Sequence, residues 1–370
     1  MKFSCEKYLL QSACAIASRA TASKSPITAL EGLLLQADND LKVTGYDLKK
    51  GIYTTIAADV SETGSVVVGA RLFGEIIRRL PDGIVTITAD ENNVNVKCGK
   101  SDFHFMGISA EEYPELPGVD GLNLITLPQN ILRSMINQTN FAVSTSDVRP
   151  IYTGTLFEIE NDDLTLVAVD GYRLAKRCEQ IETGLMEDCR FVVPGSALSD
   201  IERICSDDED KNVMISVGAK HISFAIGETV VVTRRLEGDF LNYKKSIPEN
   251  FRFVIEVERS EFMSTIDRVA LIVSEKNSSP VRLSFQDGSI DCLCVTPVGK
   301  AEDVCTCEGS GEGLEIGFND RYLMDALKAA GTDKLHICLN TASSPTVIEA
   351  ADGSKNFTYM ILPVRLRAGD

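Results

Sequence analysis

Residues 314–330 read Leu-Glu-Ile-Gly-Phe-Asn-Asp-Arg-Tyr-Leu-Met-Asp-Ala-Leu-Lys-Ala-Ala, and they form the clearest copy of a unit that recurs along the chain. Apolar residues alternate with small or polar ones from Leu314 to Phe318, which predicts a strand with one buried face. Asn319 or the next residue then offers a side-chain oxygen that can cap a helix. The apolar residues that follow are spaced at i, i+1, i+4 and i+5, so they share one helical face, and Gly331 is expected to end the helix.

The same strand-and-helix unit recurs along the chain. Further copies lie at residues 65–80 and 191–205, and a related unit precedes each copy, at 2–20, 124–139 and 251–270. The helical part of every copy keeps the same apolar spacing. Because this pattern repeats at one third of the chain length, the sequence predicts three similar domains.

Proline and glycine residues mark the limits of the three domains. We expect the first domain at residues 1–119, the second at 120–247 and the third at 248–370. Each third reads as two helices and about eight strands, with alternating segments between and after the helices. This order predicts an α+β domain of two layers, with both helices on one side of the sheets.

The composition limits the class of protein. The chain has 370 residues, a formal net charge of −17, 44% hydrophobic residues and 25% charged residues. No apolar run approaches the roughly 20 residues that a membrane-spanning helix needs. The first residues lack the pattern of a signal peptide, so we expect a cytoplasmic protein that does not bind a membrane. The negative charge argues against tight DNA binding, although the distribution of the charge matters more than its sum.

No group of residues suggests catalysis. His104, His221 and His336 lie in alternating segments, where we expect ordinary strand residues. The sequence has no phosphate-binding loop, no nucleophile elbow and no carboxylate pair in a setting that favours acid–base chemistry. The glycine-rich stretch 309–313 precedes a strand and is expected to be a flexible turn. We therefore predict no catalytic residue and no cofactor.

The eleven cysteines are expected to be reduced thiols, because their number is odd and the chain reads as intracellular. The pairs at Cys292 and Cys294 and at Cys305 and Cys307 would place their sulfurs on one face of two strands. Such strands could hold a metal ion with four sulfur ligands. The alternative is a buried face that uses cysteine as a small apolar residue, and we predict this alternative and no metal site.

The solvent faces of the predicted helices mix basic and acidic residues. For a single helix, this mixture predicts an ordinary solvated surface. If three similar domains are joined end to end with all helices facing inward, however, these faces line one common surface. A long chain of three repeats without a reactive group is typical of a scaffold protein.

The whole chain resembles the bacterial DNA polymerase III β subunit family, the sliding clamps. The segments that carry the resemblance are Leu33-Leu-Leu, Asp147-Val-Arg, Val169-Asp-Gly-Tyr-Arg-Leu, Ser274-Glu-Lys, Glu315-Ile-Gly-Phe-Asn and Tyr359-Met-Ile-Leu-Pro-Val-Arg-Leu. The resemblance implies a head-to-tail homodimer, a ring of six similar domains that encircles double-stranded DNA without sequence specificity. Such a ring holds polymerase on its template and is not itself a catalyst. The implied partners are the DNA polymerase III alpha subunit, the clamp loader, and other DNA polymerases and repair proteins.

The resemblance also implies three surfaces. The peptide-binding cleft would use Tyr152, Val169, Gly171, Arg173, Leu174, Leu241, Lys245, Ser246, Asn319, Tyr322, Ser343, Pro345, Met360, Ile361, Leu362, Pro363, Val364 and Arg365. The DNA-facing residues would be Lys24, Arg71, Arg78, Arg79, Arg133, Arg203 and Arg268. The dimer interface would use Lys100, Phe103, Phe105, Leu271, Ile272, Glu302 and Asp303.

Several of these positions depart from the residue types that are usual in the family. Tyr152, Leu241, Lys245 and Ser246 do so in the cleft, which leaves the preferred peptide motif open. Asp102 stands where a basic residue is usual, so one ion pair of the dimer interface is expected to be missing or replaced. The alternatives to a DNA clamp are a β-rich interaction scaffold that does not act on DNA and an enzyme whose catalytic group is not recognisable.

Overall fold

The computed structural model describes residues 1–119, 123–181, 188–273, 279–354 and 356–366. The chain forms two compact units, of which the first is built mainly from residues 1–133 and 196–235. The strands of the first unit are β1 (Lys2–Glu6), β2 (Gly32–Ala37), β3 (Leu41–Tyr46), β4 (Lys50–Ile56), β5 (Asp59–Glu62), β6 (Gly64–Gly69), β7 (Ile84–Asp90), β8 (Asn93–Cys98), β9 (Ser101–Met106), β10 (Asn123–Pro128), β15 (Asn212–Val217), β16 (His221–Ile226) and β17 (Thr229–Arg234). Its helices are α1 (Lys7–Ala17), α2 (Ala70–Arg79) and α4 (Gly195–Ile204), with short 3₁₀ helices η1 (Ser18–Ala20), η2 (Thr28–Glu31) and η3 (Ala110–Glu112).

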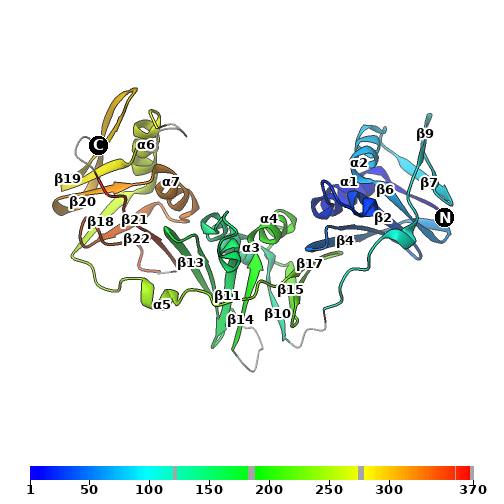
Figure 1. Ribbon diagram of the computed structural model, residues 1–370, viewed down its shortest axis with the longest axis horizontal. Coiled ribbons are helices and arrows are strands. Elements are labelled where there is room, and N and C mark those ends of the chain that lie inside the picture. The colour runs from blue at the N-terminus through cyan, green and yellow to red at the C-terminus, as the bar shows by residue number, and fades with distance from the viewer. Residues whose placement is uncertain (120–122, 182–187, 274–278, 355, 367–370) are drawn as a thin grey trace. The chain divides into compact units, whose positions relative to one another are not determined.

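The strands of the first unit form two antiparallel sheets (Figure 1). One sheet has the order β5-β1-β7-β8-β9, and the other has the order β10-β15-β16-β17-β4-β3-β2-β6. Helices α1 and α2 pack against each other and bury Leu10, Phe73 and Ile77 in a core with the strands. Leu72 fits the apolar spacing of the copy at residues 65–80, which predicts a buried side chain, but it is 56% exposed.

The second unit contains the remaining elements. Its strands are β11 (Gly154–Glu160), β12 (Asp163–Val169), β13 (Arg173–Gln180), β14 (Cys189–Pro194), β18 (Phe253–Glu258), β19 (Val281–Thr296), β20 (Gly299–Phe318), β21 (Lys334–Leu339), β22 (Thr346–Ala350) and β23 (Phe357–Ile361). Its helices are α5 (Tyr243–Ser246), α6 (Arg259–Ala270) and α7 (Asp320–Ala329), with η4 (Asn140–Ala142) and η5 (Pro150–Thr153). Helix α3 (Gln129–Asn137) begins in the first unit and ends in the second.

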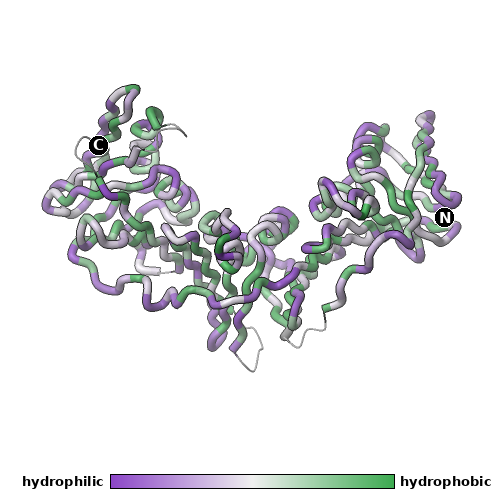
Figure 2. The backbone as a smooth tube through the Cα atoms, viewed as in Figure 1, coloured by the Kyte–Doolittle hydropathy of each residue, from purple (hydrophilic) through white to green (hydrophobic). Residues whose placement is uncertain are grey.

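One antiparallel sheet runs through the second unit. Its order is β14-β11-β12-β13-β23-β22-β21-β18-β20-β19. Helices α6 and α7 pack side by side, and their buried faces form one core with strands β18 to β23. Figure 2 shows the hydrophobic residues that run along the strands of both units, as the alternating pattern predicted.

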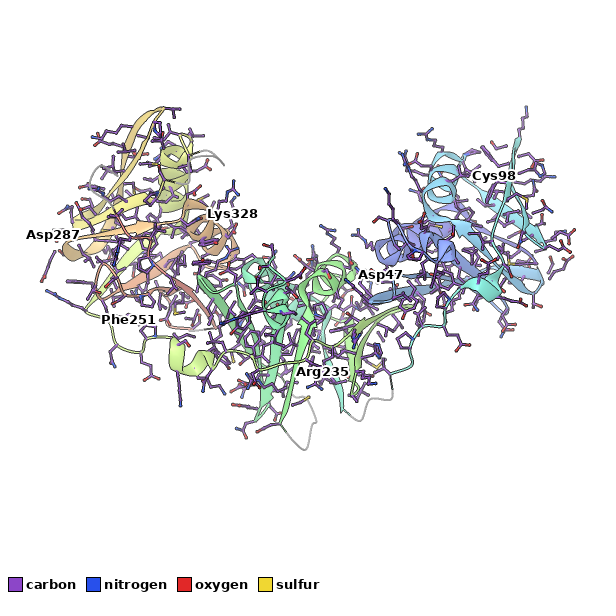
Figure 3. The ribbon with its side chains drawn as sticks, in the orientation of Figure 1. Asp47, Cys98, Arg235, Phe251, Asp287 and Lys328 are labelled. Carbon is purple, nitrogen blue, oxygen red and sulfur yellow. The ribbon has the colours of Figure 1, made fainter. Side chains whose placement is uncertain are left out.

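The repeat is confirmed by details of the backbone as well as by the order of elements. Asp47 precedes β4 (Figure 3), and Asp170 precedes β13. Each carboxylate accepts hydrogen bonds from the backbone N–H groups two and three residues later, at 2.7–3.0 Å. The residue after each aspartate, Leu48 or Gly171, has a positive φ of 72° or 96°. Two turns of the same geometry thus introduce equivalent strands of two repeats.

Three local predictions are wrong. The described part of the third repeat has six strands rather than about eight. Strands β19 and β20 are long, and each runs through a position at which the first and second repeats have a turn. The stretch 309–313 lies within β20 and forms an irregularity of the strand, with positive φ at Gly309 and Gly313. Helix α7 does end at Ala329, but Gly331 does not adopt the left-handed conformation of a cap. A Cβ at Gly331 would lie 2.9 Å from the side-chain nitrogen of Gln138, so the glycine leaves room for this amide beside the end of α7.

Candidate functional site

The predicted cleft lies in the second unit, where β13 of the second repeat pairs with β23 of the third. Leu174 is directly opposite Met360 in the antiparallel register. Beyond the strand, the backbone N–H of Leu362 donates to the carbonyl oxygen of Tyr172 at 2.8 Å. The two most specific segments of the sequence, 169–174 and 359–366, are therefore held side by side by backbone hydrogen bonds.

Five predicted cleft residues meet in one apolar cluster, which we call the cleft cluster. They are Tyr152, Val169, Leu174, Leu241 and Met360. Residues 236–247, the linker that follows β17, contribute further apolar side chains, and Phe240 packs edge-to-face on Tyr152 with ring centroids 5.6 Å apart. Burial of large apolar side chains contributes about 1.5–3 kcal/mol each, so this cluster fixes the linker against the sheet.

A second group of predicted residues surrounds a cavity of about 490 Å³. The predicted residues that line it are Ser343, Leu362, Pro363, Val364 and Arg365, and they are joined by Glu315, Gly317, Ala342 and Leu366. Val364 forms an isolated antiparallel bridge with Gly317, which holds the C-terminal segment beside β20. A Cβ at Gly317 would lie 2.7 Å from the carbonyl oxygen of Val364, so only glycine permits this close approach.

Arg173, another predicted cleft residue, forms contacts that stabilise the fold. Arg173 donates to Asp170 at 2.9 Å, to Asp325 of α7 at 2.6 Å and to the carbonyl oxygen of Phe141 at 2.8 Å. Its guanidinium also lies 4.4 Å from the ring centroid of Tyr322. Arg173 therefore ties the second repeat to the third and has few donors left for a ligand.

The remaining predicted cleft residues lie on several different elements outside the cleft cluster. Asn319 caps α7, because its side-chain oxygen accepts from the backbone N–H of Tyr322 at 3.2 Å. Lys245 and Ser246 lie on α5, and Pro345 is half-buried just before β22. Ile361 belongs to the core with α6 and α7, because alternate residues of β23 point to opposite faces. The structure therefore places Ile361 away from the surface that carries Met360.

Sequence reasoning missed Tyr172. Its ring is 63% exposed and stacks on Tyr322, with centroids 6.3 Å apart and planes 24° from parallel. The signal was available, because Tyr172 stands inside the quoted segment 169–174 and an exposed aromatic residue beside an apolar cluster favours binding.

The predicted dimer interface falls on two strand edges. Strand β9 ends the five-stranded sheet, and residues 299–307 of β20 pair on one side with β19. Phe103 is 40% exposed on β9, whereas Phe105 packs partly on its own core, with its ring 6.3 Å from that of Phe73. Phe105 is therefore less available to a partner than the sequence suggested.

The third-repeat members of the predicted interface differ in the same way. Leu271 is 78% exposed, whereas Ile272 packs against the core of α6 and α7. Glu302 pairs with Lys300, and Lys100 is exposed in the turn before β9. The Asp303 carboxylate accepts from Arg268 at 2.6 Å, which holds the pKa of Asp303 below its usual range.

Most of the predicted DNA-facing residues are paired with acidic side chains. The pairs are Arg78 and Arg79 with Glu75 at 2.7 and 3.0 Å, Arg133 with Asp207, and Arg268 with Asp303. Lys24, Arg71 and Arg203 are exposed and form no ion pair with a described residue. Acidic neighbours therefore offset part of the positive charge of these seven residues.

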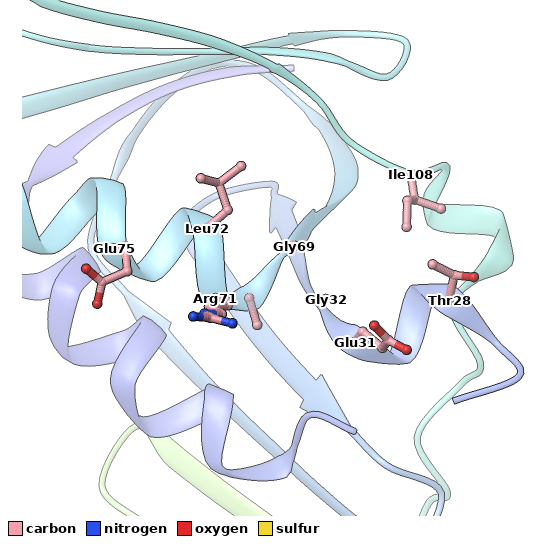
Figure 4. Close-up of a pocket in the computed structure, with 9 residues that line it drawn as sticks. Thr28, Glu31, Gly32, Gly69, Arg71, Leu72, Glu75 and Ile108 are labelled. Carbon is pink, nitrogen blue, oxygen red and sulfur yellow. The ribbon is translucent and has the colours of Figure 1, made fainter. Parts of the chain in front are cut away.

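A further cavity, of about 470 Å³, lies at the start of α2 in the first unit (Figure 4). Arg71, Leu72 and Glu75 line one side of it, and Thr28 and Glu31 of η2 line the other. Ile108, from the segment after β9, completes the apolar part of the lining. No sequence motif predicted this cavity.

The cysteine pairs lie on neighbouring antiparallel strands, β19 and β20. Burial raises the pKa of Cys292 and of Cys305 to about 12, so both remain protonated thiols at neutral pH. Among the described residues, no group of three or more histidine, cysteine or acidic side chains is arranged to hold a metal ion. Cys292, Cys294 and Cys305 are buried members of the core with α6 and α7, and Cys307 packs partly against it.

Three α+β repeats, joined by continuous sheets and with an apolar cluster at the joint of the second and third repeats, define the class of three-domain clamps. Sequence models of the DNA polymerase III beta subunit match the chain in order: the N-terminal domain at residues 1–117, the central domain at 126–242 and the C-terminal domain at 244–365. The beta sliding clamps of Staphylococcus aureus and Staphylococcus epidermidis are each 32% identical over 359 residues, which cover 94% of each chain.

Solved structures agree with the sequence comparison. The DNA polymerase sliding clamp of Bacillus subtilis has a TM-score of 0.94 at 29% identity, covering 99% of this chain and 100% of that one. A putative DNA polymerase III beta subunit of Eubacterium rectale has a TM-score of 0.93 at 30% identity, covering 98% and 99%. The chain therefore belongs to the DNA polymerase III beta subunit family, the beta sliding clamps. It is a non-catalytic polymerase subunit and a processivity factor in DNA replication, with DNA and polymerase as its partners.

The helices of the described residues are too short or too polar to span a membrane.

Proposed function

We propose that two copies of this chain join head to tail into a ring of six domains around duplex DNA. The domains are those expected from the sequence, at residues 1–119, 120–247 and 248–370. The ring tethers the replicative polymerase through its alpha subunit, and it works in the cytoplasm, where a bacterial chromosome is copied. The observation that carries the proposal is a joint between repeats that occurs twice in the chain.

In each joint, the last strand of one repeat pairs with an inner strand of the repeat before it. Strand β17 pairs with β4, with Val231 opposite Ile52, and β23 pairs with β13, with Tyr359 opposite Ala175. The corresponding last strand of the first repeat is β9, and the third-repeat counterpart of the inner strands β4 and β13 is residues 299–307 of β20. Neither pairs with a further strand in the described residues, apart from one contact of Glu308 with β18. Edge strands invite pairing, so two copies can close both edges at once.

The test of the ring uses one substitution on each edge. Phe103→Asp on β9 and Leu271→Asp beside the opposite edge should each give monomers of about 40 kDa in sedimentation, since the chain has a mass of 40.3 kDa. Val148→Asp, which changes an 88% exposed valine outside both edges, should leave dimers of twice that mass.

Mixing the two monomeric variants tests the head-to-tail arrangement. The Leu271→Asp chain keeps an intact β9 edge, and the Phe103→Asp chain keeps an intact edge at residues 299–307. The mixture should therefore form dimers through one seam. Dimers that persist in each separate variant, or a mixture that stays monomeric, would contradict this geometry.

The cleft cluster and the neighbouring cavity are proposed to receive short peptide segments of the polymerase alpha subunit, the clamp loader, other DNA polymerases and repair proteins. The support is an apolar cluster beside the stacked rings of the exposed Tyr172 and the half-buried Tyr322, next to a cavity of about 490 Å³. A sliding clamp of Pseudomonas aeruginosa, 27% identical with a TM-score of 0.93, has been solved with griselimycin bound. We propose that the present chain also binds a ligand, a peptide at the cleft cluster, and that two apolar anchor side chains of the peptide supply most of the affinity.

Calorimetry with a synthetic acetylated peptide that presents a Leu-Phe pair tests the cleft. The expected Kd is near micromolar, about −8 kcal/mol. Met360→Ala should weaken binding by about tenfold or more, because it removes a side chain of the cleft cluster. Met106→Ala is a matched control, because this methionine is 68% exposed in the other unit. Equal loss in both variants would exclude the cleft as the binding surface.

A further inference from the structure

The linker that forms one wall of the cleft is held by a buried polar contact. The hydroxyl of Tyr243, the first residue of α5, donates to the Oε2 carboxylate oxygen of Glu158. Tyr243 is 3% exposed and Glu158 is 7% exposed, although Glu158 stands on β11, which lies 85 positions away along the chain. Contacts between a charged acceptor and a buried hydroxyl are stronger than ordinary hydrogen bonds.

Charged groups from each side keep this carboxylate ionised. Lys244 lies 3.0 Å from Glu158 and also pairs with Glu160 at 2.8 Å, and Arg190 of β14 lies 3.7 Å from the other oxygen. Desolvation by burial opposes ionisation, but the hydrogen bonds from Tyr243 and Lys244 outweigh it and lower the pKa of Glu158. Burial and the contact with Glu158 together raise the pKa of Tyr243, so its hydroxyl remains a donor at every physiological pH.

The ring and the hydroxyl of Tyr243 contact different neighbours. The ring is a buried member of the cleft cluster, which also contains Leu174, Met360 and Leu241. Helix α5 itself is only four residues long and is closed by a hydrogen bond from Ile247 N–H to the Tyr243 carbonyl oxygen at 3.2 Å. Because so short a helix has little stability of its own, its position depends on the contacts of Tyr243.

We propose that Glu158 is a positioning residue for the peptide-binding cleft, which acts by holding the Tyr243 hydroxyl and thereby the linker wall at residues 241–246. This inference rests on the proposed peptide-binding function. Glu158 is not a member of the cleft cluster, and it lines a separate cavity of about 300 Å³ together with Tyr243 and Lys244. When the contact is absent, the linker leaves the sheet for part of the time, and the apparent affinity falls by the fraction of molecules with an incomplete cleft.

The test compares three variants with the same acetylated Leu-Phe peptide. Tyr243→Phe keeps the ring and removes the hydroxyl, so peptide affinity should fall by about tenfold, the factor expected for one hydrogen bond to a charged group. Glu158→Leu should give a similar loss. Glu158→Gln keeps an oxygen that can accept from Tyr243, and it should restore affinity to within about threefold of the unchanged protein.

A control variant and a second measurement separate the positioning of the linker from a general loss of stability. Tyr113→Phe removes a hydroxyl that donates to the Thr44 carbonyl oxygen, in the corresponding linker of the first unit, and should leave peptide affinity unchanged. Hydrogen exchange should accelerate at residues 241–247 in Tyr243→Phe, while exchange in β11 stays slow.

The outcomes distinguish this inference from the function on which it rests. If the unchanged protein does not bind the peptide, the proposed cleft fails. If it binds, and Met360→Ala weakens binding while Tyr243→Phe and Glu158→Leu do not, the cleft stands and the positioning role of Glu158 is wrong. A Glu158→Gln variant as weak as Glu158→Leu would also overturn it.

Discussion

Asp200 shows how a single carboxylate joins two repeats of the first unit. This residue of α4 is 7% exposed, and its carboxylate pairs with Lys50 of β4 and, at 3.6 Å, with Arg19 of η1. In the second unit, Asp325 of α7 makes the equivalent contact with Arg173. The same helix position thus carries an acidic residue that binds the neighbouring repeat in both joints.

We predict that Asp200→Ala destabilises the first unit strongly. Lys50, whose side chain is only 11% exposed, would be left as a buried charge without its main partner. Breaking such a buried pair costs about 3–5 kcal/mol, and urea unfolding followed by circular dichroism should show the loss. Asp82→Ala is the control, because Asp82 pairs with Lys7 at 3.2 Å but is 99% exposed. Such exposed pairs contribute little, so similar losses in the two variants would contradict this account.

At the scale of elements, the start of α7 offers the clearest test. Asn319 accepts from the Tyr322 N–H and satisfies one of the donors that a helix leaves unpaired at its start. Asn319→Ala should lower the free energy of unfolding by about 1 kcal/mol, whereas Asn319→Asp retains a capping oxygen and should be close to the unchanged protein. Thermal unfolding measures both, and an Asp variant as unstable as the Ala variant would show that the cap does not stabilise α7.

The periodic patterns predicted the long helices and most strands because those patterns reflect which face of an element is buried. They could not predict how far a strand continues, and β19 and β20 pass through positions where the other repeats turn. Leu72 fits the apolar spacing of α2 but is exposed at the cavity beside η2, since spacing does not reveal what covers a helix.

The candidate site was predictable only in part for a similar reason. The apolar residues of the cleft stand in recognisable segments near 169–174 and 359–366. The contact of Arg173 with Asp325 joins residues 152 positions apart, and that of Tyr243 with Glu158 joins residues 85 apart. No local pattern specifies such pairs, because each depends on how strands from different repeats are brought together.

For the whole molecule, the charge raises the question of how this clamp holds DNA. The chain has 54 acidic residues and 37 basic ones, and several helix arginines are already paired with acidic neighbours, such as Arg78 with Glu75. Few counterions would therefore be released on DNA binding, which predicts weak and salt-sensitive direct affinity. Contacts with phosphates alone carry no base information, so no sequence preference is expected.

Weak contacts suffice if the ring encloses the DNA, because then release requires opening of a seam or sliding off an end. After loading by its clamp loader onto a closed circular duplex, the protein should remain bound in salt high enough to abolish phosphate contacts. A single cut in the circle should release it, because the ring can then slide off. The Phe103→Asp variant should not be retained on either DNA, since its seam does not close. Equal retention of the unchanged protein on cut and uncut circles would show that direct contacts hold it on DNA. This result would contradict the proposed ring.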